Sequence, residues 1–348
     1  MNDDFQRRMA DAARLMRSGS LVEATAAIRQ ALGGASAGAP GRDDRDVIDV
    51  EARVVGDAVT PPGATSSAPA GSFVSGHFRN DCGARDYKLF EPARDGRPLP
   101  LVVMLHGCTQ DPDDFARGTR MNALARAQGL LVLYPAQSRR ANAQRCWSWF
   151  KHNHQARGKG EPAILAGMVR DAIATHGADP ARVYVAGLSA GGAMAAILGD
   201  AYPELFAAVG VHSGLPTGSA TDVQTAFAAM SGGARPLRRS PQAGATPPTI
   251  VFHGDADATV NVVNGERVIA AAGLSARSDA VHGASAMGVP YTRRVFLDAQ
   301  GAERAEQWTI HGAGHAWSGG DVAGSYTDPR GPDASAEMLR FFLRHPQG

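Results

Sequence analysis

The sequence predicts an α/β protein built on a doubly wound, mostly parallel sheet, preceded by an N-terminal helical segment and a linker. Three observations support this prediction. Short apolar runs alternate with stretches of helical periodicity through most of the chain. The run at 100–107 is apolar, as expected of a central strand that is covered on both faces. The run at 182–186 turns tightly through glycines into a helix-like stretch of small residues.

Length and composition fit a soluble globular protein. The chain has 348 residues, enough for one large α/β domain with an appendage or for two small domains. Of these residues 44% are hydrophobic and 20% charged. A formal net charge of +1 gives no reason to expect nucleic acid as a partner. No apolar run approaches the length needed to cross a bilayer, and the N-terminus lacks the basic-then-apolar order of a signal peptide.

The N-terminal part of the chain differs in character from the rest. Residues 4–32 show apolar residues at helical spacing, broken at Gly19 into two helices. We expect a helical segment over 1–32 that either packs on its own protein or acts as an interaction or docking segment. Residues 33–71 are rich in Gly, Ala, Pro, Ser and Asp and are predicted to form a flexible linker. A compact domain is expected over 72–348.

The elements of this domain follow from apolar patterning and turn residues. The predicted strands are two edge strands at 72–78 and 85–90, the central strand at 100–107, and strands at 129–135, 182–186, 207–211, 249–253, 293–297 and 306–310. The predicted helices are 114–128, 162–176, one directly after Ser189, and a closing helix at 335–343. The Gly/Pro-rich segment 215–248 is expected to form an excursion over the carboxyl edge of the sheet.

Ser189 is the candidate nucleophile. It lies in Gly187-Leu188-Ser189-Ala190-Gly191, a G-x-S-x-G pattern between a predicted strand and a predicted helix. In that context the turn is so sharp that the residues two before and two after the serine must be small, and the hydroxyl stands at its tip. The alternative is an ordinary β–α turn whose serine caps the helix.

A serine hydroxyl needs a base, which in turn needs an acid, and in sheets of this topology the three follow in the order Ser, Asp or Glu, His. Asp257 is preferred as the acid over Asp255, because a residue deeper in the turn after a strand can reach the next loop. His315 is preferred as the base because it lies in a small-residue loop directly after a strand. The other histidines that follow Asp257 lie in a polar loop, at a strand end or in the tail: His282, His311 and His345.

The developing oxyanion needs hydrogen-bond donors. We expect these to be the backbone N–H groups of Ala190, directly after the nucleophile, and of Cys108, in the loop after the central strand, with His106 shaping that loop. On spacing alone, Cys108 and Cys146 are equally consistent with a disulfide and with two free thiols. No Cys/His metal spacing, Walker loop or dinucleotide fingerprint is present, so we expect no metal and no cofactor.

Four aromatic residues flank these motifs in the sequence. Aromatic side chains in loops beside a catalytic edge suggest an apolar wall for the substrate, although burial in the core is the alternative. The predicted substrate-binding residues are Trp147, Trp149, Phe150 and Trp317.

Five motifs together resemble those of the poly(3-hydroxybutyrate) depolymerase-type esterases, an α/β-hydrolase family that includes feruloyl and acetylxylan esterases. They are residues 105–110, 146–150, 187–192, 253–257 and 314–320, and the resemblance covers about 72–345. It implies Ser189, Asp257 and His315 as a catalytic triad. It also implies an oxyanion hole at Cys108 and Ala190, and a Cys108–Cys146 disulfide.

The resemblance also implies an activity. We expect a serine carboxylic-ester hydrolase that forms an acyl-enzyme, acting on short-chain hydroxyalkanoate esters or oligomers, with feruloyl or acetylxylan esters as the alternative. A serine peptidase of the same fold and a non-catalytic binding protein are the less favoured hypotheses. The resemblance implies an extracellular location. The missing signal peptide pattern makes the cytoplasm the alternative.

Overall fold

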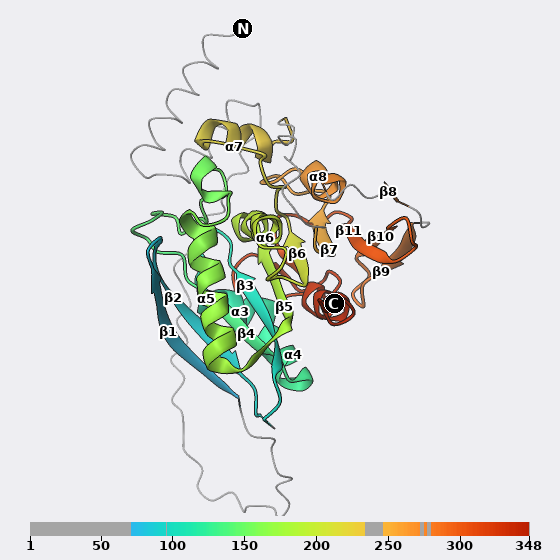
Figure 1. Cartoon of the computed structure of the whole chain (residues 1–348). Helices are drawn as coiled ribbons and strands as arrows, with labels where there is room; N and C mark the ends of the chain where they lie inside the picture. The colour runs from blue at the N-terminus through green and yellow to red at the C-terminus, as the bar shows by residue number, and fades with distance from the viewer. Residues whose placement is uncertain (1–70, 95, 234–245, 272–274, 277–279, 348) are drawn as a thin grey trace, which may run out of the picture. The chain divides into compact units, whose positions relative to one another are not determined.

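The computed structural model describes residues 71–94, 96–233, 246–271, 275–276 and 280–347 (Figure 1). The predicted helical segment at 1–32 and the predicted linker as far as residue 70 lie outside these ranges.

One large sheet runs through the described domain. Its strand order is β1-β2-β4-β3-β5-β6-β7-β11-β10-β8, with β9 paired to β10. The strands are β1 (Ser72–Asn80), β2 (Gly83–Glu91), β3 (Leu99–Leu105), β4 (Leu131–Pro135), β5 (Ala178–Leu188), β6 (Ala208–His212), β7 (Thr249–Gly254), β8 (Ser275–Ala276), β9 (Val281–Ala284), β10 (Pro290–Leu297) and β11 (Glu303–Ile310). A separate short pair joins β12 (Trp317–Ser318) to β13 (Thr327–Asp328).

The centre of the sheet is parallel and its two ends are antiparallel. Neighbours pair in parallel from β4 through β3, β5, β6 and β7 to β11. The β1–β2 hairpin, blue in Figure 1, adds antiparallel strands at one end, and β10 does so at the other. The predicted mostly parallel sheet is confirmed.

Helices cover both faces of the sheet, as the apolar central strands require. They are α3 (Pro112–Thr119), α4 (Met121–Gln128), α5 (Gly160–His176), α6 (Ala190–Ala201), α7 (Val223–Met230), α8 (Val263–Ala271), α9 (Ala334–Leu343) and the short 3₁₀ helix η1 (His152–His154). Side chains of α5, α6 and α8 share one core cluster, and those of α3, α4 and α9 share another.

The central strand β3 contributes to both core clusters. Leu101 and Val103 belong to the first cluster, whereas Val102 and Met104 belong to the second. This two-residue alternation places apolar side chains on both sides of the strand, which explains why its sequence is apolar throughout.

Several elements differ from the predictions. The predicted helix at 114–128 is two helices, because Arg120 adopts a left-handed backbone conformation with φ 54° between α3 and α4. Within the predicted excursion at 215–248, α7 forms behind a capping box between Asp222 and Thr225, and residues 234–245 lie outside the described ranges. His282, predicted in a loop, lies in β9, and helix α8 was not predicted.

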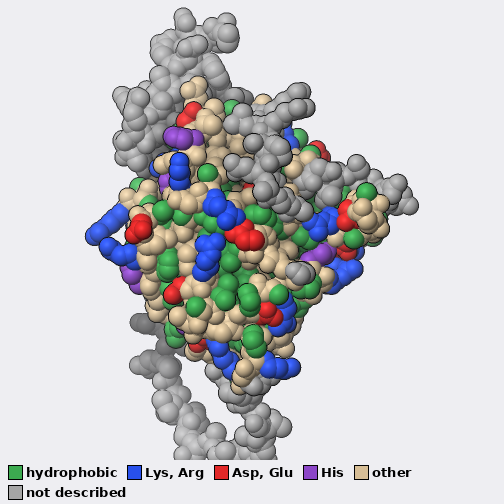
Figure 2. Space-filling view, in the orientation of Figure 1, with side chains coloured by type: hydrophobic (Ala, Val, Ile, Leu, Met, Phe, Trp, Pro, Cys, Tyr) green, Lys and Arg blue, Asp and Glu red, His purple; other side chains and the backbone are tan. Residues whose placement is uncertain are grey.

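The described helices and the charged surface residues bear on whether the protein spans a membrane or binds a charged partner. Among the described helices, none is long and apolar enough to span a membrane. On the face shown in Figure 2, Lys and Arg side chains are interspersed with Asp and Glu. This mixture agrees with the formal net charge of +1.

Candidate active site

The four loops that carry the predicted catalytic groups leave the sheet at the same edge. Cys108 follows β3, Ser189 follows β5, Asp257 follows β7 and His315 follows β11. These strands belong to the parallel part of the sheet, so their carboxyl ends lie along one edge. In open α/β sheets this is the edge where ligands bind.

The turn at Ser189 is strained and tightly packed. Ser189 has φ 58° and ψ −117°, a conformation that non-glycine residues rarely adopt. A Cβ atom on Gly191 would lie 2.0 Å from the carbonyl oxygen of Leu105, and one on Gly187 would lie 2.3 Å from the carbonyl carbon of Gly191. Both flanking positions therefore require glycine. The Ser189 side chain makes no capping hydrogen bond to α6, which argues against the helix-cap alternative.

Asp257 and His315 lie side by side. His315 Nδ1 is 2.7 Å from Asp257 Oδ2, and the backbone N–H groups of Thr259 and Val260 each donate to Asp257 Oδ1 at 2.8 Å. Burial alone would raise the pKa of Asp257, but hydrogen bonds from His253 and His315 outweigh it and hold that pKa well below its ordinary value. The carboxylate is therefore ionised at neutral pH and able to orient the imidazole of His315.

Asp255 forms a different pair. Its Oδ2 lies 2.8 Å from His311 Nδ1, and its Oδ1 accepts the N–H of Gly312 at 2.7 Å. His311 Nε2 lies 2.8 Å from Thr292 Oγ1, so both ring nitrogens of His311 are engaged. The Asp255 and His311 side chains are also partly exposed. This pair lacks a free imidazole nitrogen for a serine, which favours Asp257 and His315 as the acid and base.

Backbone contacts fasten the loop of His315 to the loop of Asp257. Ala313 C=O accepts the N–H of Ala256 at 3.1 Å, and Ile310 C=O accepts the N–H of Asp255 at 3.1 Å. A Cβ atom on Gly254 would lie 2.2 Å from the Ala313 oxygen, so only glycine permits this approach. The two loops thus meet through main-chain atoms as well as through the carboxylate.

The candidate oxyanion loop is braced by a covalent link. The structure contains the Cys108–Cys146 disulfide that the family resemblance implied, and Thr109 N–H donates to Gln144 C=O at 2.6 Å. Ala190 is the first residue of α6, so its N–H has no acceptor within that helix. These are the positions where we expected the two oxyanion donors.

Gln110 is a brace that sequence reasoning missed. Its Oε1 accepts the N–H of Gly107 at 2.9 Å, and its Nε2 donates to the carbonyl oxygen of Ser325 at 2.9 Å. The side chain is buried and joins the oxyanion loop to the segment after His315. Ser325 lies far along the chain, so no local pattern signalled this contact.

His106 shapes the oxyanion loop from inside the core. Its Nε2 accepts the N–H of Gln137 at 3.1 Å, and its Nδ1 lies 2.7 Å from the carbonyl oxygen of Gly107. Burial lowers the pKa of His106 to about 4, so the ring is neutral at pH 7. Both nitrogens have backbone partners, which agrees with the expected shaping role.

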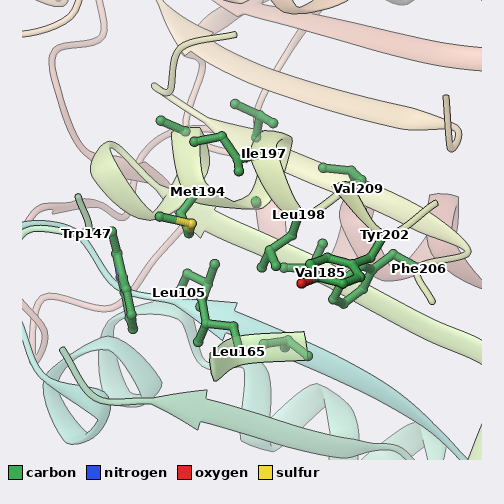
Figure 3. Packing of buried hydrophobic residues seen from close by; sticks show 14 of the residues in the cluster. Leu105, Trp147, Leu165, Val185, Met194, Ile197, Leu198, Tyr202, Phe206 and Val209 are labelled. Carbon is green, nitrogen blue, oxygen red and sulfur yellow. The ribbon is translucent and has the colours of Figure 1, made fainter. Parts of the chain in front are cut away.

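Three of the four predicted substrate-binding aromatics face the core. Trp147, Trp317 and Trp149 are 0%, 1% and 6% exposed, so the prediction that they form a substrate wall is wrong. Trp147 belongs to the same core cluster as Leu105 and Met194 (Figure 3), and its Nε1–H donates to the His106 carbonyl at 3.1 Å.

Trp317 is buried like Trp147, whereas Phe150 is only half-buried. Trp317 donates its Nε1–H to Ser335 Oγ at 3.0 Å, which accounts for its burial in the second core cluster. Phe150 is half-buried, against the edge of Trp149 at 5.7 Å between ring centroids. A substrate-binding role for Phe150 stays a prediction.

A buried carboxylate supports the loop that contains Cys146. Glu161 is 1% exposed, accepts the N–H of Ser148 at 2.7 Å and pairs with Arg85 Nη2 at 3.1 Å. Gln137 Nε2 donates both to Glu161 and to the Cys146 carbonyl, the latter at 3.0 Å. Glu161 opens a helix in the sequence, where a carboxylate is ordinary, and its partners are distant in the chain. Sequence reasoning therefore had no signal for this brace.

Glu161→Gln is expected to destabilise the protein by about 3 kcal/mol, because it leaves the buried charge of Arg85 unpaired. Burial alone would raise the pKa of Glu161, but hydrogen bonds from His154, Gln137 and Ser148 outweigh it and lower that pKa. A carboxylate whose pKa is lowered in the folded state stabilises that state fully at pH values above its unfolded pKa of about 4.3. This stabilisation is lost as the pH falls further. The free energy of unfolding, measured in urea at several pH values, should therefore differ less between wild type and variant at acid pH.

The matched control is Asp86→Asn, which breaks a solvent-exposed pair with His77. Such a pair contributes at most about 1 kcal/mol, so its removal should shift the unfolding midpoint little. If the difference in free energy of unfolding between wild type and Glu161→Gln stayed constant down to acid pH, the charge of Glu161 would not be the source of the stabilisation.

Comparisons with known proteins identify relatives of this chain. A family model described as "Esterase PHB depolymerase" matches residues 86–308. The poly(3-hydroxyalkanoate) depolymerase C of Paucimonas lemoignei is 32% identical over 243 residues, which cover 66% of this chain and 58% of that protein. The poly(3-hydroxybutyrate) depolymerase of Ralstonia pickettii is 28% identical over 285 residues, which cover 76% of this chain and 57% of that protein.

The chain thus spans less than two thirds of the length of these two relatives. Among solved structures, an acetyl xylan esterase from Aspergillus awamori matches with a TM-score of 0.59 at 20% identity. The match covers 74% of this chain and 94% of that one, and it shows a shared fold. The predicted α/β-hydrolase class is confirmed.

Proposed function

The chain belongs to the PHB depolymerase family of esterases, and we propose that it is a serine carboxylic-ester hydrolase that works through an acyl-enzyme. The observation that supports this most directly is the part-buried Asp257–His315 pair, in loops that leave the sheet at the same edge as the strained serine turn. Two N–H donors, from Cys108 and Ala190, complete the proposed machinery.

In the proposed acylation step, His315 Nε2 takes the proton of the Ser189 hydroxyl as its oxygen attacks the ester carbonyl carbon. The N–H groups of Cys108 and Ala190 stabilise the oxyanion of the tetrahedral intermediate. The intermediate collapses as the C–O bond to the alcohol breaks, and His315 returns the proton to the leaving oxygen. Asp257 holds the imidazole tautomer and stabilises its cation throughout.

Water completes the cycle. His315 takes a proton from the water as its oxygen attacks the acyl carbon of the Ser189 ester. Collapse of the second tetrahedral intermediate releases the carboxylic acid, and the proton returns to Ser189 Oγ. No cofactor takes part in the proposed mechanism.

For the substrate we propose short-chain hydroxyalkanoate esters or oligomers. The names of the two bacterial relatives support this choice, since both are polyhydroxyalkanoate depolymerases. For the location we propose an extracellular or otherwise oxidising compartment, which the Cys108–Cys146 disulfide supports.

A substrate panel tests both the class and the acyl group. We expect hydrolysis of p-nitrophenyl acetate and butyrate and of a soluble hydroxybutyrate trimer, and much slower hydrolysis of p-nitrophenyl octanoate, methyl ferulate and a peptide anilide. A burst of p-nitrophenol equal to the enzyme concentration would report the acyl-enzyme when deacylation is slower than acylation. Preference for methyl ferulate would favour an aromatic-acid esterase, and cleavage of the anilide alone would favour a peptidase.

A further inference from the structure

His212, the last residue of β6, contacts two of the loops that carry proposed catalytic residues. Its carbonyl oxygen accepts the N–H of Ser189 at 2.8 Å. Its ring atom Nε2 accepts the N–H of Ser318 at 3.0 Å. Ser318 lies just beyond His315, so one residue fastens both the nucleophile turn and the end of the loop of the base.

The contacts of the imidazole define its protonation state. A backbone N–H can only donate, so Nε2 carries no proton, and the Nδ1–H donates to Ser213 Oγ at 3.1 Å. The ring lies between those of Trp317, at a centroid distance of 5.0 Å, and Phe252, at 5.9 Å. Burial, with repulsion from His253 and His315, lowers the pKa of His212 to about 3. The acceptor is therefore present throughout the neutral range.

The loop of His315 is held by contacts on both sides of that residue. Gly312 has φ 73°, and Cβ atoms on Gly312 and Gly314 would have nothing within 4 Å, whereas Ala313 between them is buried in the second core cluster. Before His315 the loop is fixed by the contact of Ala313 C=O with Ala256 N–H at 3.1 Å. After His315 it is fixed by Trp317 and Ser318 against His212. His315 itself contacts Asp257 at 2.7 Å, and beyond it β12 also pairs with β13, so the contact of Ser318 with His212 is one of several that hold the loop.

We propose that His212 is a positioning residue for the proposed ester hydrolysis: its ring nitrogen fixes the loop of His315 against the strand end that holds Ser189. This inference rests on the proposed function. His212 is fully buried, so its side chain has no access to a substrate. It acts by setting the distance between the base and the nucleophile, to which catalysis is very sensitive.

Two substitutions separate the acceptor from the ring. His212→Phe retains an aromatic ring between Trp317 and Phe252 and removes the acceptor for Ser318 N–H. His212→Gln loses the ring and places an amide oxygen where Nε2 stood. With p-nitrophenyl butyrate we expect kcat to fall about 100-fold in His212→Phe, with KM little changed, because a small misplacement of a catalytic group has an effect of this size. His212→Gln should retain kcat to within about 10-fold of wild type, since it restores the acceptor.

The variant His315→Ala, which lacks the proposed base, distinguishes a positioning role of His212 from a general structural defect. In His315→Ala, His212→Phe should cause no further loss of residual activity, because the group that His212 positions is absent. Phe342→Leu is the matched control for core damage: Phe342 stacks on Tyr184 at 5.1 Å, is fully buried in the core cluster that also holds Trp317, and lies on α9. It should lower the melting temperature without lowering kcat.

The proposal is overturned if His212→Phe retains wild-type kcat, if both His212 variants lose kcat equally, or if His212→Phe reduces activity further in His315→Ala. The rate at which a fluorophosphonate labels Ser189 supplies the same test without an ester. Labelling should slow in His212→Phe and recover in His212→Gln. If the wild type hydrolyses no ester, the proposed function fails, while the labelling rates still decide the role of His212.

Discussion

Ser189→Ala is expected to lower kcat for p-nitrophenyl butyrate by about 10⁵- to 10⁶-fold, the loss seen when a catalytic serine is removed from a triad. The proposed mechanism has no other nucleophile, so only binding and the oxyanion donors would remain to accelerate attack by water. The strained turn that presents the hydroxyl should survive, because alanine keeps the Cβ atom and the glycines on either side are unchanged. Initial rates at saturating ester measure the loss of kcat, and melting temperatures check that the variant is folded.

The control is Ser231→Ala, at an exposed serine whose hydroxyl donates to the Ala228 carbonyl at 3.0 Å at the end of α7. It should keep wild-type rates. If Ser189→Ala retained activity within about 10-fold of wild type, Ser189 could not be the nucleophile of the proposed mechanism.

Asp257→Asn is expected to lower kcat by about 10⁴-fold with the fold intact. The amide oxygen can still accept the N–H groups of Thr259 and Val260, which leaves the amide nitrogen facing His315 Nδ1. Two donors cannot pair, so His315 adopts the tautomer whose proton lies on Nε2, and that nitrogen can no longer accept the proton of Ser189.

The neighbouring Asp255→Asn supplies the comparison. Asp255 pairs with His311 and not with His315, so we expect kcat to change less than about 10-fold. Parallel measurements of kcat in the two variants decide between the aspartates. If Asp255→Asn showed the larger loss, the base would have to be reassigned to the Asp255–His311 pair.

The parts of the site that lie within one short stretch were predictable from sequence. The Ser189 turn is an example, because strand, glycines and helix are contiguous and local sterics fix the geometry. Asp257 and His315 followed from the order of catalytic residues along a parallel sheet, combined with the positions of β7 and β11. Short apolar runs between helix-like stretches also placed the strands of the parallel centre.

What could not be predicted depends on contacts between distant segments. Trp147 and Phe150 belong to one aromatic stretch, yet Trp147 is buried and Phe150 half-buried, and no local pattern tells which way each ring turns. The braces through Glu161 and Gln110 and the anchor at His212 join residues that are far apart in the chain. Their polar side chains can be buried because specific partners satisfy them, and those partners are defined only by the folded structure.

The disulfide also has a consequence for the unfolded chain. Cys108 and Cys146 are 38 residues apart and enclose α3, α4 and β4, a complete crossover between two neighbouring parallel strands. In the chain-entropy description, closing a loop of this size removes freedom from the unfolded ensemble equivalent to about 4 kcal/mol. In the oxidised chain the exits of β3 and β4 are therefore tied together whether or not the rest of the sheet has assembled. A chain that folds under reducing conditions has to bring these two strands together from an unfolded ensemble that lacks this covalent restriction.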